Sequence, residues 1–206
     1  MTKLFLIRHG ETIWNIERRY QGQKDSPLSE EGIRQGQITG RFLAERKVDA
    51  VYSSDLSRAV KTAEAIAHHH GLTPELDPRI REMSFGVWEG MTRDEIKQTF
   101  PDVFYARYKD SMNTRIPGGE LPHEVVERFQ GFLNELVKTH QNETVVVVSH
   151  GGSLRFVIAS LLHIPLEKSY CLHLSNAGIS ELLYQVTHKQ CQWEAITLNS
   201  TGHLLT

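Results

Sequence analysis

The sequence predicts an α/β protein built as a three-layer α/β/α sandwich, with a mostly parallel central sheet, helices on both faces and an edge insertion. Short β-branched runs alternate along the chain with longer segments whose apolar residues recur at helical spacing. Between residues 73 and 122 this alternation weakens, and five of the seven prolines fall there. Such a segment is typical of an insertion with less regular structure.

The first part of the chain predicts the order strand, helix, strand, helix. Lys3 to Ile7 is a short apolar run rich in strand-forming residues, so we expect a buried strand. Ser29 to Arg46 begins with a capping serine followed by two acidic residues, which predicts a helix. Val48 to Tyr52 predicts the next strand. Ser54 to His70 has one apolar stripe and is followed by glycine, which predicts a helix that ends there.

The second part of the chain adds the elements that complete the sheet. Within the insertion, Thr92 to Glu95 matches a capping box, and we expect this short helix to end at Pro101. Pro122 to His140 predicts a long amphipathic helix. Thr144 to Ser149 contains four consecutive valines, which indicates a central strand covered on both faces. A further helix and two edge strands are expected at Ser153–His163, Ile179–Val186 and Gln192–Leu198.

The composition excludes several classes of protein. A chain of 206 residues with a net charge of -2 suits one domain over residues 1–206 and has no basic excess for nucleic acid or an anionic membrane. Its apolar runs are much shorter than the roughly 20 residues that cross a bilayer. The N-terminal run is broken at Arg8, unlike a signal peptide. We expect a cytoplasmic monomer or homodimer, and the spacing of Cys171 and Cys191 suggests neither a disulfide nor structural zinc.

Two of the predicted strands end in a histidine that is followed by glycine. The chain reads Leu-Ile-Arg-His-Gly at residues 6–10 and Val-Ser-His-Gly-Gly at residues 148–152. Ligands of open α/β sheets bind beyond the carboxyl ends of the strands. If the two strands are parallel neighbours, His9 and His150 lie at one edge of the sheet, beside turns or helix starts that offer N–H groups. This arrangement favours an anion-binding site.

The segment Arg8 to Thr12 resembles the signature of the histidine phosphatase superfamily, the group that includes cofactor-dependent phosphoglycerate mutases. Six further segments resemble that family in the same order: Trp14-Asn15, Leu28 to Gly32, Tyr52 to Ala59, Arg81-Glu82, Phe85 to Gly90 and Ser149 to Gly151. A lone Arg-His-Gly would be weak evidence, whereas an ordered set over about 150 residues is specific. The resemblance therefore implies one histidine phosphatase domain over the whole chain.

The resemblance also implies an activity. It predicts a phosphomonoester hydrolase that acts on small phosphorylated metabolites through a phosphohistidine on His9. Arg8 and Arg58 would bind the phosphate oxygens with guanidinium groups that stay charged, and His150 would donate to the same oxygens. Glu82, in apolar surroundings near Phe85, would protonate the leaving oxygen and later activate water. With these donors, neither a metal nor another cofactor is required.

Further residues are expected to bind the substrate: Asn15, Gln21, Gly22 and Gly151. Asn15 would contribute an amide donor. Gln21, Gly22 and Glu82, together with the loop from Pro117 to Glu120, would form the wall that selects the leaving group. Gly10 would allow the backbone and the phosphate to approach each other closely.

Three other functions remain open from the sequence. The tail from Ala195 to Leu204 weakly resembles α-ribazole phosphatases of cobalamin synthesis. A cofactor-dependent phosphoglycerate mutase is a second alternative, although the short stretch after Glu82 differs from the mutase pattern. A phospho-ligand binding domain with weak catalysis is the third. Structural explanations also compete: Glu82 could pair with Arg79 or Arg81, and Trp14 could be a packing residue.

Overall fold

The computed structural model describes residues 1–185 and 192–205. Its centre is a six-stranded sheet with the order β3-β2-β4-β1-β5-β6. The strands are β1 (Thr2–Arg8), β2 (Ala50–Ser53), β3 (Glu75–Leu76), β4 (Thr144–Ser149), β5 (Ile179–Tyr184) and β6 (Trp193–Ser200). The first four strands of the chain pair in parallel, whereas β5 is antiparallel to both β1 and β6. The predicted mostly parallel sheet is confirmed.

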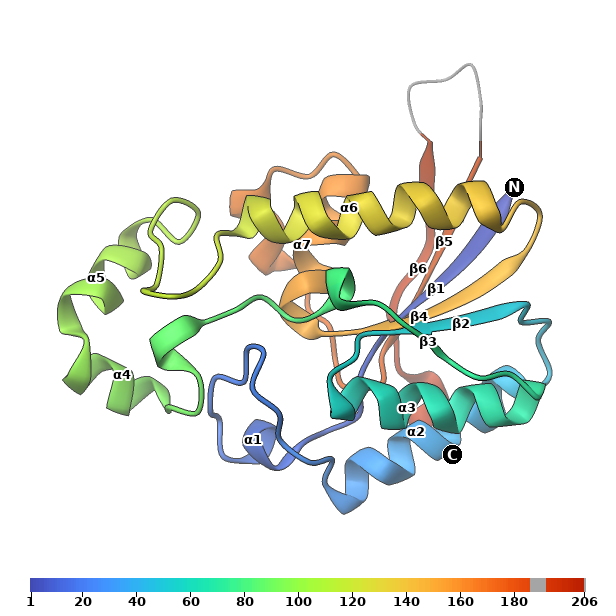
Figure 1. The fold of residues 1–206 in the computed structure, drawn as a ribbon, viewed down its shortest axis with the longest axis horizontal. Helices are drawn as coiled ribbons and strands as arrows, with labels where there is room; N and C mark the ends of the chain where they lie inside the picture. The colour runs from blue at the N-terminus through green and yellow to red at the C-terminus, as the bar shows by residue number, and fades with distance from the viewer. Residues whose placement is uncertain (186–191, 206) are drawn as a thin grey trace.

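Helices cover both faces of the sheet (Figure 1). One face carries α6 (Pro122–Thr139) and α7 (Gly151–Leu161), and the other carries α2 (Glu30–Ala44) and α3 (Ser57–Ala67). The remaining α-helices among the described residues are α1 (Ile13–Ile16), α4 (Arg93–Thr99) and α5 (Pro101–Lys109). This confirms the three-layer α/β/α architecture.

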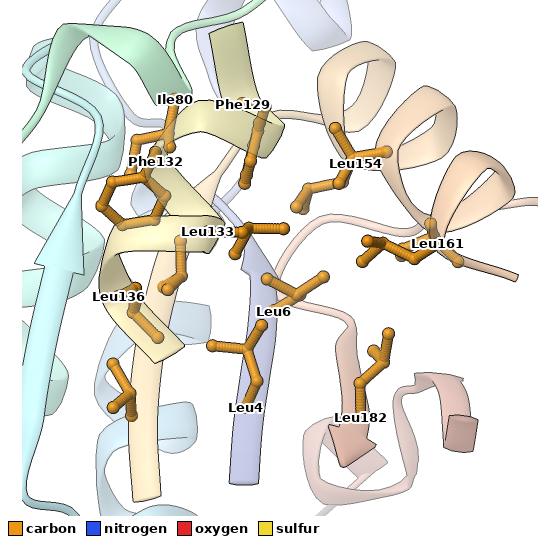
Figure 2. Close-up of a cluster of buried hydrophobic side chains, with 14 of the residues drawn as sticks. Leu4, Leu6, Ile80, Phe129, Phe132, Leu133, Leu136, Leu154, Leu161 and Leu182 are labelled. Carbon is orange, nitrogen blue, oxygen red and sulfur yellow. The ribbon is translucent and has the colours of Figure 1, made fainter. Parts of the chain in front are cut away.

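The alternation of side chains along the central strands divides the core into two layers. Leu4 and Leu6 of β1 face α6 and α7, where they pack with the aromatic and leucine side chains of those helices (Figure 2). Phe5 and Ile7 point to the opposite face and pack against α2 and α3. The valines of β4 alternate in the same way. Both faces of the two strands are buried, as the run of four valines predicts.

One expectation about individual elements is confirmed and another is wrong. The short helix α4 ends at Thr99, just before Pro101 as expected, and Pro101 is then the first residue of a further helix, α5. Proline suits that position because its missing N–H would have no partner within the helix. The strand predicted from Ile179 is not an edge strand, because β5 lies between β1 and β6. Val186 and Cys191 lie outside the described residues.

The inserted segment begins as the edge strand β3 and then leaves the sheet. Figure 1 shows α4 and α5 beyond the carboxyl ends of the strands. They surround a separate small core in which Trp88, Ile96 and Ile116 are buried. The predicted capping box of α4 is present, since the Thr92 and Glu95 side chains cap each other's backbone N–H groups. In the part of the chain that the structure describes, no helix has both the length and the apolarity to cross a membrane.

Candidate active site

The register between β1 and β4 places the two strand-end histidines side by side. Arg8 and Ser149 are the last paired residues of the two parallel strands, so His9 and His150 follow at the same level. The His9 N–H donates to the Ser149 carbonyl at 3.0 Å. The centres of the two imidazole rings are 5.1 Å apart, and both residues are buried. The expected proximity of the histidines is confirmed.

A cavity of about 300 Å³ lies beside His9. Eight of the nine predicted site residues line it: Arg8, His9, Asn15, Gln21, Gly22, Arg58, Glu82 and Gly151. His150 is the ninth, and it is buried against the His9 ring. Arg18, Arg19 and Arg155 also line the cavity, so it is surrounded by five arginines and a single carboxylate. This charge distribution favours an anionic ligand.

The contacts of His9 define which of its ring nitrogens can react. Its Nδ1 lies 2.7 Å from the Gly10 carbonyl oxygen. Because a carbonyl can only accept a hydrogen bond, Nδ1 carries the proton of the neutral ring and Nε2 keeps its lone pair. Burial lowers the pKa of His9 well below its ordinary value of 6.5, and the charges of Arg58 and Arg8 lower it further. At neutral pH, His9 therefore presents a nucleophilic Nε2.

Arg58 is held in place from one side only. Its guanidinium donates to the Gly22 carbonyl at 2.7 Å and to the Lys24 carbonyl at 2.8 Å, and it pairs with Asp25 at 3.2 Å. Gly22 has a positive φ of 56°, a conformation that glycine adopts without strain. Burial lowers the pKa of Arg58, but a guanidinium remains charged at any physiological pH.

Several buried polar atoms around the two histidines have no hydrogen-bond partner among the described residues. They are Nε of Arg8, Nε of Arg58 and both ring nitrogens of His150. An unpaired buried donor costs free energy, so such a group normally has a partner when the protein binds its ligand. Burial and the charge of Arg58 lower the pKa of His150 well below its ordinary value, so its neutral ring has one N–H to donate. Unpartnered donors of this kind favour an oxygen-rich anionic ligand.

Glu82 lies at the N-terminus of α7, in more polar surroundings than the sequence predicts. Its carboxylate accepts from the backbone N–H groups of Gly152 at 3.0 Å and Ser153 at 2.8 Å. It also accepts from the Met83 N–H and the Ser153 hydroxyl. The expectation of an apolar environment is therefore wrong. These two N–H groups of α7 hold Glu82, so they are not the free donors expected beside His150.

Comparison with known proteins is consistent with this geometry. The family model described as Histidine phosphatase superfamily (branch 1) matches residues 4–200. The chain belongs to this superfamily. It is 37% identical over 205 residues to phosphoserine phosphatase 1 of Hydrogenobacter thermophilus, covering 99% of this chain and 95% of that relative. It is 36% identical over 195 residues to a protein of Erwinia tasmaniensis named "Probable phosphoglycerate mutase GpmB", covering 95% and 89%.

A solved structure supports the same assignment of fold. The α-ribazole phosphatase from Shigella flexneri matches this histidine phosphatase with a TM-score of 0.88 and 29% identity, over 96% of each chain. The superfamily fold thus extends over nearly the whole chain, including the insertion. The relatives differ in the substrates that their names specify, so the family alone does not identify the substrate.

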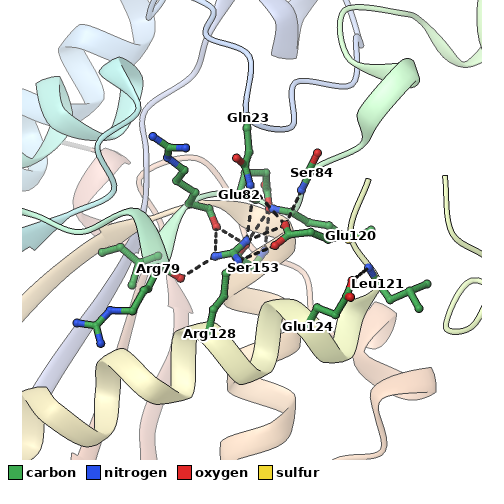
Figure 3. A network of polar contacts seen from close by, with 12 residues as sticks. Gln23, Arg79, Glu82, Ser84, Glu120, Leu121, Glu124, Arg128 and Ser153 are labelled. Carbon is green, nitrogen blue, oxygen red and sulfur yellow. Dashed lines mark hydrogen bonds and ion pairs between the residues drawn. The ribbon is translucent and has the colours of Figure 1, made fainter. Parts of the chain in front are cut away.

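Arg128 of α6 fixes the segment that carries Glu82 in this histidine phosphatase (Figure 3). Its guanidinium donates to the carbonyl oxygens of Arg79 at 2.6 Å, Arg81 at 2.9 Å and Glu82 at 3.0 Å. It also forms an ion pair with Glu120 at 2.8 Å. The sequence pattern did not single out Arg128, because it lies on a helix that looks merely amphipathic.

The possible ion pairs of Glu82 with Arg79 and Arg81 do not form. Arg79 instead pairs with Asp77 and Glu135, and Arg81 pairs with Asp55. The alternative interpretation of Glu82 as a surface ion-pair partner is therefore wrong.

Gly10 has a steric role in addition to the one expected for it. A Cβ atom at Gly10 would lie 2.4 Å from the Gly32 carbonyl oxygen, and a Cβ atom at Gly32 would lie 1.9 Å from the Glu11 carbonyl oxygen. The two glycines let the turn after β1 contact the first turn of α2. A Cβ atom at Gly151 would lie 3.0 Å from Arg8 Nε, so that glycine leaves room for the guanidinium.

Three further observations correct or extend the predicted site. The loop from Pro117 to Glu120 does not line the cavity beside His9, because Gly119 pairs with Phe85 and Glu120 binds Arg128. Trp14, expected to be a packing residue, does line the cavity beside His9.

Asn15 Oδ1 accepts from Thr12 and from Asn176, so its amide nitrogen is the group available to a ligand. The sequence analysis did not predict Arg18 and Arg19 as site residues. Their position shortly after the motif of residues 8–12 could have suggested that they line the cavity.

Proposed function

We propose that this protein is a phosphomonoester hydrolase that transfers the phosphoryl group of a small phosphorylated metabolite to His9 and then to water. The observation that carries the proposal is the protonation and the position of the His9 ring. Its Nδ1 is engaged by the Gly10 carbonyl, its neutral form is favoured, and it lines an arginine-rich cavity. A nucleophile beside preorganised positive charge is what phosphoryl transfer requires.

In the first step, the lone pair on His9 Nε2 forms the N–P bond while the bond from phosphorus to the leaving oxygen breaks. Arg8, Arg58 and His150 stabilise the charge on the phosphoryl oxygens through donors that no described residue occupies. Glu82, in its protonated form, gives its proton to the leaving oxygen, which departs as an alcohol. Asn15, Gln21, Gly22 and Gly151 line the same cavity and are proposed to contact the substrate.

In the second step, Glu82 accepts a proton from water while the water oxygen attacks phosphorus and the N–P bond breaks. Inorganic phosphate leaves, and His9 and Glu82 return to their starting protonation states. The arginines and His150 supply the positive charge and hydrogen bonds that a metal would otherwise provide. We therefore propose that the reaction is independent of metal ions.

Trapping the phosphoenzyme tests this proposal. Enzyme mixed with a ³²P-labelled substrate in buffer containing EDTA and quenched in alkali should retain label that is released by acid, because phosphohistidine is acid-labile. Inorganic phosphate should appear as substrate disappears. His9→Ala should lose both the label and turnover, whereas His123→Ala, which replaces an exposed histidine of α6, should keep them.

Other outcomes would contradict individual parts of the proposal. Acid-stable label, or turnover by His9→Ala, would exclude His9 as the nucleophile. Loss of activity in EDTA that magnesium or zinc restores would exclude the metal-independent step. Conversion of 3-phosphoglycerate to 2-phosphoglycerate that is faster than phosphate release would identify a mutase instead.

A further inference from the structure

A second cavity, of about 600 Å³, adjoins the first between the insertion and α7. Tyr20, Phe85, Gly152 and Arg155 line both cavities, so the two lie side by side. Because the first cavity contains His9, the group attached to the phosphate can extend into the second. This placement depends on the proposed function, in which the phosphoryl group lies beside His9.

The walls of the second cavity are mostly aromatic. The lining includes Tyr20, Phe85, Trp88, Phe104, Tyr108, Phe156 and Tyr170. Phe104 and Tyr108 come from α5, whereas Phe156 comes from α7, so the insertion and the sheet domain build this surface together. Flat aromatic side chains favour an apolar or aromatic ligand body.

The charged groups of this cavity all have the same sign. Its lining contains Arg93, Arg107 and Arg155 and no aspartate or glutamate. Among the described residues, no carboxylate forms an ion pair with any of the three. Arg93 and Arg155 lie over the rings of Phe104 and Tyr170 instead. Three arginines without a counter-charge attract an anionic group of the ligand.

Arg107 is the most unusual of the three because it is only 9% exposed. Its guanidinium donates to the Thr114 carbonyl at 2.6 Å and contacts Met83 Sδ at 4.0 Å, and both partners are uncharged. Burial lowers the pKa of Arg107. A buried charge is costly unless it is paired, so a charged partner from the ligand would stabilise it. The buried indole N–H of Trp88, which lines the same cavity, also lacks a partner among the described residues.

We propose that the second cavity binds the leaving group and selects phosphomonoesters whose apolar or aromatic leaving group carries a carboxylate, with Arg107 as the residue that recognises the carboxylate. Arg93 and Arg155 add to the positive potential. The phosphate and the carboxylate of one substrate then bind in the two adjacent cavities, which fixes the orientation of the ester bond beside His9.

The test compares matched pairs of phenyl phosphates. Each pair carries the same para-alkyl chain ending either in a carboxylate or in the uncharged carboxamide, and the chain length increases along the series. For the wild-type protein, the ratio of kcat/KM for the carboxylate to that for the carboxamide should reach about tenfold or more at the best chain length. Arg107→Met should bring this ratio close to one, and Arg107→Lys should retain part of it.

Two further variants keep the test decisive. Arg115→Met removes an arginine of the same insertion that pairs with Glu124 outside the cavity, and it should leave the ratio unchanged. If Arg107→Met does not fold, Arg93→Met, at an exposed position, should lower the ratio instead. A wild-type ratio near one, or a ratio that no cavity variant changes, would overturn the proposal. Failure of the wild type to hydrolyse any of these esters would instead count against the proposed phosphatase function.

Discussion

In the active site, some side-chain atoms already have hydrogen-bond partners in the protein and others do not. Arg58 uses its terminal nitrogens to bind Gly22, Lys24 and Asp25, whereas its Nε has no partner among the described residues. Glu82 is held by the backbone of α7 through both of its oxygens. Each group is thus fixed by the protein on one side, so little reorganisation is needed when the substrate binds.

The role of Glu82 as the general acid predicts a dependence on the leaving group. Glu82→Gln should lower kcat for alkyl phosphates by about 10²-fold or more, because their alkoxides need a proton to leave. The loss for p-nitrophenyl phosphate should be less than about tenfold, because nitrophenolate leaves without protonation. Glu124→Gln, at an ion pair outside the cavity, serves as the control. Equal losses on both substrates would exclude Glu82 as the acid.

At the scale of secondary-structure elements, close backbone contacts position the turn that carries His9. Gly32→Ala would force a methyl group against the Glu11 carbonyl, and we expect a loss of roughly 1–3 kcal/mol in the free energy of unfolding. The kcat should also fall, because Glu11 follows the His9-Gly10 turn. Denaturant unfolding and steady-state kinetics measure both effects.

Gly131→Ala is the matched control for this substitution. Gly131 lies within α6, and a Cβ atom there meets nothing within 4 Å. Alanine has the higher helix propensity, so this variant should gain up to about 1 kcal/mol and keep its activity. A Gly32→Ala protein as stable and active as the wild type would refute the proposed steric role.

Arg128 of α6 also positions the segment that carries the proposed general acid, Glu82. Because Arg128 binds the carbonyls of Arg79, Arg81 and Glu82, we expect Arg128→Lys to misplace the Glu82 carboxylate. A lysine cannot reproduce the planar fork of the guanidinium. The kcat for alkyl phosphates should fall by about tenfold or more, with a smaller loss for p-nitrophenyl phosphate. Arg115→Lys is the control, and a change confined to KM would contradict this positioning role.

For the molecule as a whole, the two buried histidines link stability to pH. Burial and neighbouring arginines lower the folded-state pKa of His9 and of His150, whereas an unfolded chain titrates near 6.5. Below that pH the unfolded state binds more protons than the folded state, so stability decreases as pH falls. Between 6.5 and the lowered values, each histidine contributes a slope of up to about 1.4 kcal/mol per pH unit.

Denaturant unfolding in phosphate-free buffers from neutral to mildly acidic pH measures this slope. The wild-type free energy of unfolding should decrease as pH falls below the ordinary histidine pKa, and His150→Gln should show a shallower decrease. Inorganic phosphate should stabilise the wild type by binding to the folded state. A wild-type profile that is flat or rises toward acidic pH would contradict the buried neutral histidines.

The sequence by itself determined the layers of the fold and the residues at the two strand ends. The valines of β4 predicted a central strand because burial on both faces requires apolar side chains at consecutive positions. His9 and His150 could be paired from the sequence because parallel strands end at the same edge of a sheet. These features depend on local patterns and on one rule of sheet geometry.

Only the tertiary structure decided which distant residues complete the site. Arg128, Arg107 and Arg155 lie on amphipathic or irregular helices, where a charged residue usually faces solvent. Their roles depend on contacts with segments far away in the chain, such as Arg128 with residues 79–82. The antiparallel β5 was also placed by packing rather than by propensity. A local pattern specifies the face that an element buries, but the groups that meet there depend on how the elements pack together.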